Sequence, residues 1–320
     1  MAVRRSRAPA PSKCHNWIFA PTHSLTVAAQ SRHASACGWM ANYIPNSTRP
    51  RAILNWYRAE LNEVKIYHED LADVSLYLDN HKDISLETEK PHFEGIMRVV
   101  QKYHPIDGGT EILEVGTGTG WLPILCKQRG WKCKGLEISP QLVEFARQWG
   151  ARFGIDPEIE LGNLEDSDLG REQFDIIICS NVFEHVEHWR QGVKKVYDAL
   201  KPGGVMYFES TNKCSFTSGE YKFPLYGWLP NSARYRLRIA RQGPDIMKLG
   251  IDFHQFTHSG LRREFRKAGF SRILDRVEIA QDAWVSAEWK KTVIKVSKNF
   301  RPAKAVSLMF SDATRFICVK

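Results

Sequence analysis

The chain has 320 residues, a formal net charge of +9, 43% hydrophobic residues and 25% charged residues. This is the composition of an ordinary globular protein, and it excludes disordered, collagen-like and coiled-coil classes. The length fits one enlarged α/β domain or a domain with substantial additions, and no apolar run is long enough to span a membrane. The seven cysteines are scattered and form no C-x-x-C pair, so neither a disulfide framework nor a zinc knuckle is indicated.

The first 59 residues carry eight Lys and Arg and no Asp or Glu. Residues 1–50 are also rich in Ser, Ala and Pro, a composition typical of a disordered basic leader or of an organellar targeting segment. Met40 offers a third interpretation, in which the residues before it are an over-extended start. The scattered cysteines indicate a reducing compartment, so we expect a cytoplasmic protein, and the acid-free N-terminus rich in Arg and Ser makes the mitochondrion the alternative.

Apolar residues recur at helical spacing over residues 51–108, which predicts a helical N-terminal cap. The pattern includes Ile53, Trp56, Tyr57 and Leu61, and later Phe93, Ile96, Met97, Val99 and Val100.

From Glu111 onward, short apolar strands alternate with helical patterns. The expected strands cover residues 111–115, 132–137, 159–161, 174–179, 204–209, 272–277 and, less regularly, 308–319. The helical patterns cover residues 121–129, 141–153, 189–200 and 259–268. This alternation predicts an α/β domain over residues 109–320, with a mostly parallel sheet and helices on both faces.

The strongest local signal is a glycine turn after the first strand, formed by Gly116, Gly118 and Gly120. Glycine lacks a Cβ, so a ligand can approach the backbone and the turn can take unusual φ and ψ angles. A nicotinamide-binding turn needs G-x-G-x-x-G, but its last position holds Trp121, so dehydrogenase chemistry is disfavoured. Glu114 adds a carboxylate at the strand tip, which suits a cationic ligand better than a pyrophosphate.

Glu137 ends the second strand, 21 residues after Gly116. A carboxylate at this point can accept hydrogen bonds from both hydroxyls of a ribose. Ser139 and Pro140 then supply an N-cap and a first-turn proline for the next helix.

These features occur with further motifs in a fixed order. They are Glu114 to Gly120, Glu137, the polar segment 162–166, the apolar strand 174–180 and Leu200-Lys-Pro-Gly-Gly204. Over about two thirds of the chain the order resembles the class I S-adenosylmethionine-dependent methyltransferases, closest in style to the ubiquinone-pathway and other small-molecule enzymes. The resemblance implies a Rossmann-like seven-stranded sheet with an antiparallel last strand at 313–319, and S-adenosyl-L-methionine as the cofactor.

The resemblance also implies a set of cofactor-binding residues at the carboxyl ends of the first four strands. They are Glu114, Gly116, Thr117, Gly118, Gly120, Glu137, Ile138, Asn163, Leu164, Ser180 and Asn181. In this set Glu114 holds the methionine end, Glu137 holds the ribose and Ile138 packs on the adenine. Asn163 stands where the family usually has Asp, and its side-chain oxygen keeps an acceptor for the adenine amino group, beside the N–H of Leu164.

His185 is the candidate catalytic base, because imidazole titrates near neutral pH and the resemblance puts this segment beside the methyl acceptor. Alternatively, the imidazole ring of His185 has a structural role and supports the following helix. Ubiquinone-pathway enzymes carry E-x-x-E-H as metal ligands at this point. Here Asn181 takes the place of the first carboxylate, so we expect no metal.

Residues 211–256 form an expected insertion lid after strand five, rich in aromatic residues and Arg. Aromatic walls with a few cations suit an acidic, aromatic or lipid-like acceptor. Segment 233–241 alternates apolar residues with Arg. As a helix it is cationic enough to touch an anionic membrane, and a solvated cap is the alternative. The candidate substrate contacts are Tyr221, Trp228, Arg234 and His254.

The sequence therefore favours methyl transfer to a small molecule, at an oxygen atom. Methylation of RNA or protein is one alternative, drawn from the basic ends of the chain. Against it, residues 60–210 hold 16 basic and 27 acidic residues, and no RNA-binding module is recognisable, so nucleic acid is not expected as a partner. A protein that binds the cofactor without catalysis is a further alternative. The oligomeric state stays open.

Overall fold

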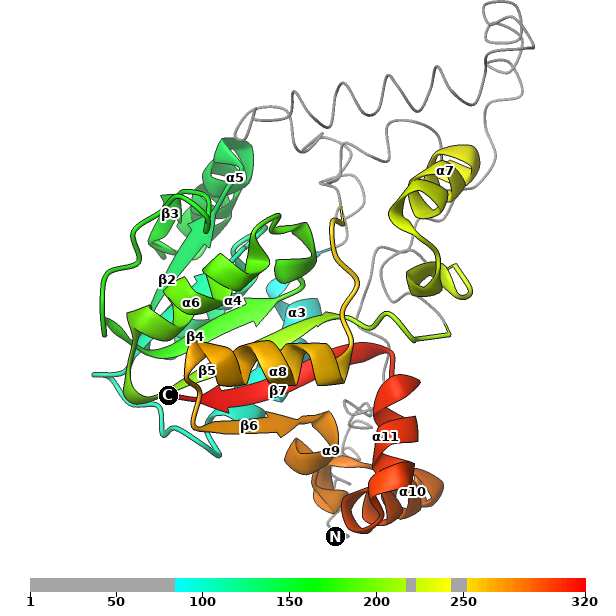
Figure 1. Cartoon of the computed structure of the whole chain (residues 1–320). Coiled ribbons are helices and arrows are strands. Elements are labelled where there is room, and N and C mark those ends of the chain that lie inside the picture. Colours follow the sequence, from blue (N-terminus) through cyan, green and yellow to red (C-terminus); the bar gives the residue numbers. More distant parts are fainter. Residues whose placement is uncertain (1–83, 217–222, 243–251) are drawn as a thin grey trace, which may run out of the picture.

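The computed structural model describes residues 84–216, 223–242 and 252–320 (Figure 1). The predicted leader, residues 1–50, and the larger part of the predicted helical cap lie outside the described residues. Of that cap the structure describes helix α3 (Leu86–Val100), which begins at a capping box between Ser85 and Thr88. The apolar residues predicted for its last two turns are buried, so this part of the predicted helical pattern is confirmed.

Seven strands form one sheet in the order β3-β2-β1-β4-β5-β7-β6 (Figure 1). The strands are β1 (Glu111–Val115), β2 (Lys132–Glu137), β3 (Ile159–Leu161), β4 (Phe174–Ser180), β5 (Leu200–Thr211), β6 (Arg272–Asp275) and β7 (Ala313–Val319). All neighbouring pairs are parallel except the two pairs that β7 makes with β5 and β6. The predicted Rossmann-like fold class is confirmed, including the antiparallel last strand.

Helices cover both faces of this sheet. On one face α3 and α4 (Trp121–Gln128) pack on the apolar side chains of β1, β4 and β5. On the other face α6 (Trp189–Ala199) and α8 (His258–Ala268) pack on the opposite side chains of the same strands. Helix α5 (Pro140–Ala151) joins β2 to β3. Because β4 is covered on both faces, Ile176 to Cys179 are all fully buried.

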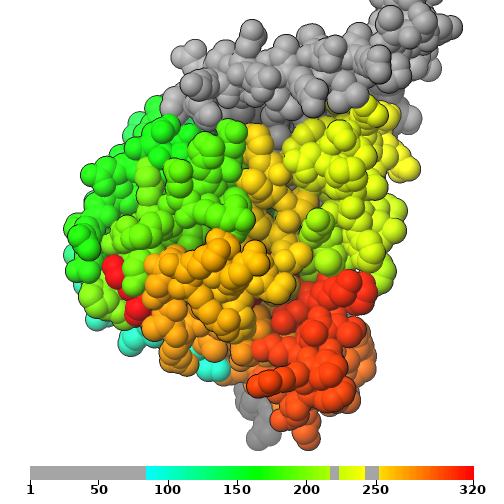
Figure 2. Space-filling view, viewed as in Figure 1, coloured from blue at the N-terminus to red at the C-terminus, as the bar shows by residue number. Residues whose placement is uncertain are grey.

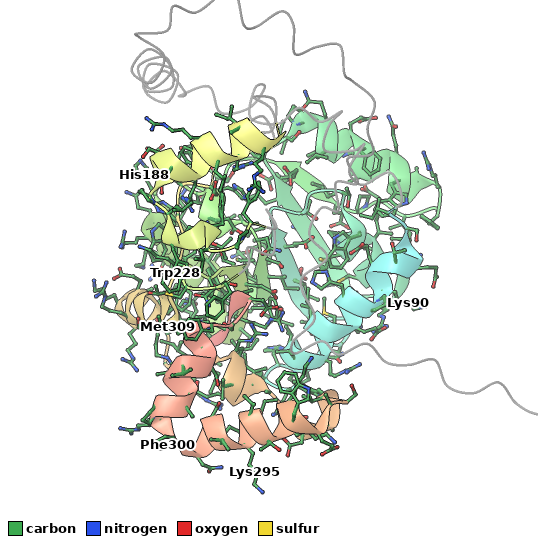
Figure 3. All side chains as sticks on the ribbon, turned by 90° about the vertical axis from the view of Figure 1, so that its right-hand side faces the viewer. Lys90, His188, Trp228, Lys295, Phe300 and Met309 are labelled. Carbon is green, nitrogen blue, oxygen red and sulfur yellow. The ribbon has the colours of Figure 1, made fainter. Side chains whose placement is uncertain are left out.

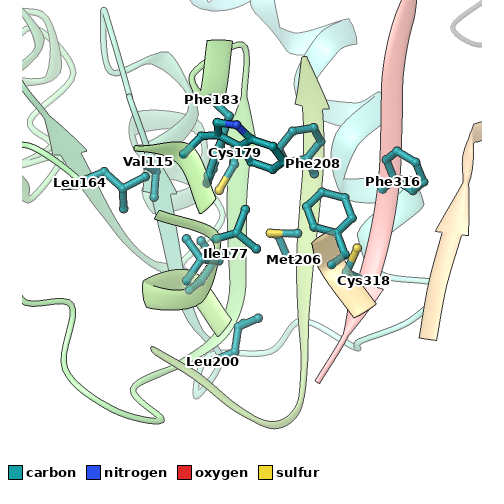
Figure 4. Close-up of a cluster of buried hydrophobic side chains, with 14 of the residues drawn as sticks. Val115, Leu164, Ile177, Cys179, Phe183, Leu200, Met206, Phe208, Phe316 and Cys318 are labelled. Carbon is teal, nitrogen blue, oxygen red and sulfur yellow. The ribbon is translucent and has the colours of Figure 1, made fainter. Parts of the chain in front are cut away.

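The larger core cluster lies between the sheet and helices α6 and α8. Figure 4 shows Ile177, Met206, Phe208 and Phe316 reaching across β4, β5 and β7 on this side. The ring of Phe208 meets that of Phe183 at 5.3 Å between centroids, and Phe183 belongs to the segment that follows β4. The core therefore directly supports the loop at the carboxyl end of β4.

A buried ion pair joins β5 to β7 on the α3 side of the sheet. Arg315 donates two hydrogen bonds of 2.8 Å to the two carboxylate oxygens of Glu209, and the Tyr207 hydroxyl donates a third, of 2.5 Å. Burial alone would raise the pKa of Glu209, but the Arg315 guanidinium outweighs it and holds the pKa at about 2.

The segment between β6 and β7 differs from the sequence expectation. The strand predicted over residues 272–277 ends at Asp275, because Asp275 and Glu278 form a capping box that starts helix α9 (Arg276–Ile279). Two further helices, α10 (Glu288–Asn299) and α11 (Arg301–Met309), follow. The strand predicted over residues 308–319 is therefore wrong in its first part, and β7 begins at Ala313.

The predicted lid segment leaves the sheet after β5 and returns along residues 252–257. Its described part contains the short helix η2 (Tyr226–Trp228) and helix α7 (Asn231–Gln242), which lies beyond the carboxyl ends of the strands (Figure 1). Asn212 and Phe256 form a parallel bridge where the segment leaves and rejoins the domain. In the described part of the chain, no helix is long and apolar enough to cross a membrane.

Candidate functional site

The glycine turn connects β1 to α4 and takes backbone angles that suit glycine. The φ angles of Gly116, Gly118 and Gly120 are +69°, +56° and +80°. A Cβ on Gly116 would lie 2.2 Å from Cγ2 of Val182, in the loop after β4, and a Cβ on Gly120 would lie 2.5 Å from Cβ of Ala146. These two glycines thus allow close packing of neighbouring elements as well as the turn itself.

Glu114 is a buried carboxylate at the tip of β1. Its Oε2 accepts a hydrogen bond of 2.5 Å from the hydroxyl of Thr117, and the residue is only 5% exposed. Burial raises the pKa of Glu114 to about 8, the Thr117 hydroxyl opposes this rise, and the nearby Glu137 adds to it. A cationic group brought next to this carboxylate would favour its ionised form.

Glu137 lies at the end of β2 and bridges two backbone segments. Its Oε2 accepts a hydrogen bond of 2.7 Å from the Gly118 amide, and its Oε1 accepts one of 3.0 Å from the Ser139 amide. Burial raises the pKa of Glu137, while these amides lower it. The Ile138 amide also lies against the carboxylate and lowers its pKa. The carboxylate is thus oriented by the backbone at the carboxyl edge of the sheet.

Two predicted residues follow β3. Oδ1 of Asn163 accepts a hydrogen bond of 3.0 Å from the Glu165 amide, which fixes the side chain against its own loop. The Leu164 side chain belongs to the core cluster with Phe183, so only its backbone remains for a ligand. Ile138, after β2, is partly buried.

The loop after β4 carries the other predicted residues. Oγ of Ser180 is buried and has no hydrogen-bond partner among the described residues. Asn181 has a φ of +54°, and its amide donates 2.9 Å to the Glu209 carbonyl. His185 ends a short 3-10 helix, η1 (Phe183–His185), and is partly buried. The unpartnered hydroxyl and the left-handed Asn181 mark this loop as a constrained segment at the carboxyl edge of the sheet.

The returning lid segment lies directly against η1. The His254 amide donates 3.2 Å to the Glu184 carbonyl, and Nε2 of His254 lies 2.8 Å from the Glu187 carbonyl oxygen. The His254 ring also lies 6.3 Å from that of Trp189, and burial lowers its pKa. The structure therefore brings the predicted His254 next to the segment that contains His185.

Arg234 lies in a buried ion cluster inside the lid. The side chains of Arg234, Arg238 and Asp252 are all fully buried, with guanidinium-to-carboxylate distances of 3.0 Å and 3.1 Å. The Tyr235 hydroxyl donates 3.0 Å to the Asp252 carbonyl. The arginines of α7 are thus divided, since Arg234 and Arg238 face inward while Arg236 and Arg241 are exposed.

The two remaining predicted substrate contacts lie apart from this cluster. Trp228 is 46% exposed at the end of η2, so its ring is accessible, and Tyr221 lies outside the described residues. Among residues 84–216, 223–242 and 252–320, no group of three His, Cys, Asp or Glu side chains is placed to hold a metal ion.

Three residues of this region were not predicted from the sequence. Asp252 anchors the lid, Val182 fills the space beside Gly116, and Ser210 donates a hydrogen bond of 2.7 Å to Oε2 of Glu184. Two acids, Asp245 and Asp252, follow the four arginines in the sequence, so the pattern suggests an acidic partner without singling out Asp252. Nothing in the sequence pattern identifies Val182 or Ser210, because their roles depend on contacts between separate strands.

Comparison with known proteins gives a family match and distant relatives. The model of a methyltransferase domain family matches residues 83–274. A "Ubiquinone biosynthesis O-methyltransferase" of Coxiella burnetii is 25% identical over 167 residues, covering 52% of this chain and 65% of that protein. The protein of the same name from Azoarcus sp. is 27% identical over 167 residues, covering 52% of this chain and 66% of its own length. The match thus spans just under two thirds of these relatives.

Solved structures match with lower identity. A S-adenosylmethionine-dependent methyltransferase from Mesorhizobium loti is 19% identical with a TM-score of 0.47, covering 74% of this chain and 100% of that chain. A SAM-dependent methyltransferase from Archaeoglobus fulgidus is 18% identical with a TM-score of 0.46, covering 77% of this chain and 99% of that chain.

Proposed function

Because the chain belongs to the methyltransferase domain family, we propose that it is an enzyme that methylates a small molecule with S-adenosyl-L-methionine as the donor. The proposed acceptor atom is an oxygen of an acidic, aromatic or lipid-like metabolite. The observation that carries the proposal is the Glu137 carboxylate at the end of β2, which the amides of Gly118 and Ser139 orient beside the glycine turn.

The cofactor supplies an electrophilic methyl group on a sulfonium centre. In our proposal Glu137 accepts from both ribose hydroxyls and Ile138 packs on the adenine. Asn163 and the Leu164 amide pair with the edge of the adenine. The turn of Gly116, Thr117, Gly118 and Gly120 surrounds the methionine end.

Glu114 recognises the amino group of that end. Its carboxylate is buried with a raised pKa, so an incoming ammonium group displaces its proton and restores its charge. The site therefore prefers a ligand end that carries an ammonium group. Removing the proton from Glu114 costs binding free energy at low pH.

Transfer forms a bond from the acceptor oxygen to the methyl carbon while the sulfur–carbon bond breaks in line. The chain's own part is to align the acceptor, exclude water and take the acceptor's proton. We assign the proton to His185, and we assign the constrained loop of Ser180 and Asn181 to shaping the space where the two reactants meet. Support comes from the position of His254, whose segment closes on the segment of His185.

The acceptor's contacts are proposed from the described part of the lid. Trp228 offers an exposed aromatic face. His254 offers a ring beside Trp189. Arg234 acts on the acceptor through the positive potential of its buried cluster, since its side chain is enclosed. Tyr221 remains a predicted contact from the sequence.

Calorimetric titration of the full chain with S-adenosylmethionine and with S-adenosylhomocysteine tests the cofactor assignment. Glu137→Ala should weaken binding of both by about ten- to a hundredfold, because two hydroxyls lose their acceptor. The matched control is Glu160→Ala, an exposed carboxylate on the neighbouring β3. Unchanged binding in Glu137→Ala, with folding intact, would contradict the assignment.

Transfer of a labelled methyl group to phenolic acids, lipid-like phenols, RNA and protein tests the acceptor class. Transfer to a phenol is the expected result. Cofactor binding without transfer to any acceptor would favour the non-catalytic alternative, and salt-sensitive labelling of RNA would favour the nucleic-acid alternative.

A further inference from the structure

A cavity lies on the α3 face of the sheet, between that helix and the strands β5 and β7. Its volume is about 30 Å³, which is room for a carboxylate group or for a few waters. Four elements contribute to its lining. They are α3 with Ile96, Arg98 and Val99, β5 with Tyr207, β7 with Arg315, and the 3-10 helix η4 (Asp282–Trp284) with Trp284. The packing of the domain therefore shapes the cavity, and no single loop does.

The cavity is positively charged. Two arginines line it, and no Asp or Glu does so among the described residues. Arg98 is exposed in the last turn of α3, and it pairs with no acid in the described part of the chain. Its guanidinium is therefore available to an anion in the cavity.

Arg315 is the deeper of the two cations, and its side chain is 15% exposed. Its Nε and Nη2 atoms bind the two oxygens of Glu209. Its Nη1 atom makes no hydrogen bond to another described residue. Because a guanidinium carries five N–H donors, Arg315 can hold Glu209 on one edge and a second acceptor on another.

The rest of the lining is mainly apolar and aromatic. Ile96 and Val99 are buried side chains of α3, and Trp284 is half-buried. Tyr207 is only 2% exposed and donates its hydroxyl proton to Glu209, so it has no proton left for an anion. A ligand in the cavity thus finds two guanidiniums for its charge and apolar walls for its body.

We propose that this cavity is a second binding site, which takes the carboxylate of a small organic acid. One carboxylate oxygen accepts from Nη1 of Arg315 and the other accepts from Arg98, while the apolar body lies between Val99 and Trp284. Nζ of Lys102 lies 5.8 Å from the centroid of the Trp284 ring and adds a further positive charge at this wall. Inorganic phosphate is a poorer occupant, because it has more oxygens to satisfy and no apolar part to bury.

The site is separate from the proposed acceptor contacts. Figure 3 shows Lys90, on α3, and the pair His188 and Trp228 on opposite sides of the sheet. In Figure 2 the face of α6, α7 and α8 is turned toward the viewer, and little of α3 is visible on it. The proposal therefore does not depend on methyl transfer or on the identity of the acceptor.

Titration of the full chain with benzoate, followed by ligand-observed NMR, tests the proposal. Benzamide is the uncharged analogue, and it should bind at least tenfold more weakly than benzoate. Inorganic phosphate should also bind at least tenfold more weakly. Arg98→Gln should raise the dissociation constant for benzoate by about tenfold or more, because a hydrogen bond between two charged groups is lost. Trp284→Leu should raise it as well, through the loss of an aromatic wall.

Matched variants separate these effects from a general loss of charge or aromatic area. Lys90→Gln removes an exposed cation about two turns earlier on α3. Trp131→Leu removes a half-buried indole that does not line the cavity. Both should bind benzoate as the parent chain does. Arg98 is at the surface, so Arg98→Gln leaves the core intact, and thermal melting verifies that each variant folds.

Four results would overturn the proposal. The first is the absence of saturable benzoate binding, and the second is equal affinity for benzoate and benzamide. The third is phosphate binding as tight as benzoate binding, which would show that the apolar walls do not contribute. The fourth is unchanged binding in Arg98→Gln together with weakened binding in Trp228→Leu, which would place the benzoate at the proposed acceptor contacts instead.

Discussion

The Gly118 amide donates a 2.7 Å hydrogen bond to Glu137, which ties the glycine turn after β1 to the end of β2. The Ser139 amide occupies the other carboxylate oxygen, so the side chain is fixed from both sides before any ligand arrives. Preorganisation of this kind lowers the entropy that binding must overcome.

Glu137→Gln should weaken S-adenosylmethionine binding by about ten- to a hundredfold, or about 1–3 kcal/mol. The isosteric amide has one acceptor instead of two, so a backbone amide and a ribose hydroxyl then face an NH₂ group. Calorimetry measures the change, with Glu160→Gln as the control. Wild-type affinity in Glu137→Gln would show that the carboxylate does not contact the ligand.

Gly116→Ala should destabilise the domain by about 1–3 kcal/mol, because it adds strain at a positive φ and a collision with Val182. Val182→Ala removes the atoms that collide but not the strain. The double variant should therefore lose less unfolding free energy than the two single variants lose together. Urea unfolding of the four proteins gives this coupling, and strict additivity would mean that the loop after β4 moves away freely.

The contribution of Glu114 to the free energy of unfolding should fall as pH rises from about 4.5 to about 8. Its pKa is raised to about 8 in the folded chain, so the folded state keeps a proton that the unfolded state has lost. Glu114→Gln should remove this part of the pH dependence. Thermal melts of both proteins across this range isolate the contribution as a difference, and parallel curves would contradict it.

Binding of the cofactor near pH 7 should also release a proton from Glu114. Calorimetry in buffers of different ionisation enthalpy measures the number of protons exchanged. The release should disappear in Glu114→Gln, even where that variant still binds.

The Glu209 and Arg315 pair should make the domain sensitive to acid. The pKa of Glu209 is lowered to about 2, so its contribution is present above pH 4.5 and is lost as pH falls from about 4.5 to 2. Glu209→Gln should cost about 3–5 kcal/mol at pH 7, because Arg315 is left buried without its partner charge. The variant should lose less stability than the parent chain between pH 5 and pH 3, as followed by urea unfolding.

Asp252→Asn should loosen the lid selectively. The substitution removes the carboxylate that Arg234 and Arg238 share, and breaking such a buried pair costs about 3–5 kcal/mol locally. Hydrogen exchange of residues 223–242 should accelerate while the strands keep their protection. Asp282→Asn, at an exposed acid in the segment after α9, is the control and should leave exchange unchanged.

Much of the domain's central part follows from local patterns. Strands β1, β2 and β3 begin and end where the apolar runs predict, and the order of Glu114, the glycines and Glu137 predicts the carboxyl edge on which they meet. The family match confirms the resemblance, and with it S-adenosyl-L-methionine as the family's cofactor. The roles of individual site residues stay predictions until the variants above are measured.

The additions to the sheet were harder to predict, for physical reasons. Segment 233–241 fits an alternating strand pattern as well as a helix, and the outcome depends on burying two arginines against Asp252, which lies outside the segment. Val293, Val296 and Phe300 of α10 have helical spacing but are exposed, so apolar spacing alone does not reveal whether a helix face packs inward.

The position of β7 between β5 and β6 has a consequence for the order of folding. β6 hydrogen-bonds only with β7 among the described strands, so it has no neighbour until the chain has passed through α9, α10 and α11. The residues that pair when β7 inserts between β5 and β6 are far apart in the sequence. Glu209 and Arg315, for example, are separated by 106 residues. Such high contact order slows folding. A nascent chain would thus hold β6 without a strand neighbour, and its edges would be open to misassembly until β7 inserts between β5 and β6.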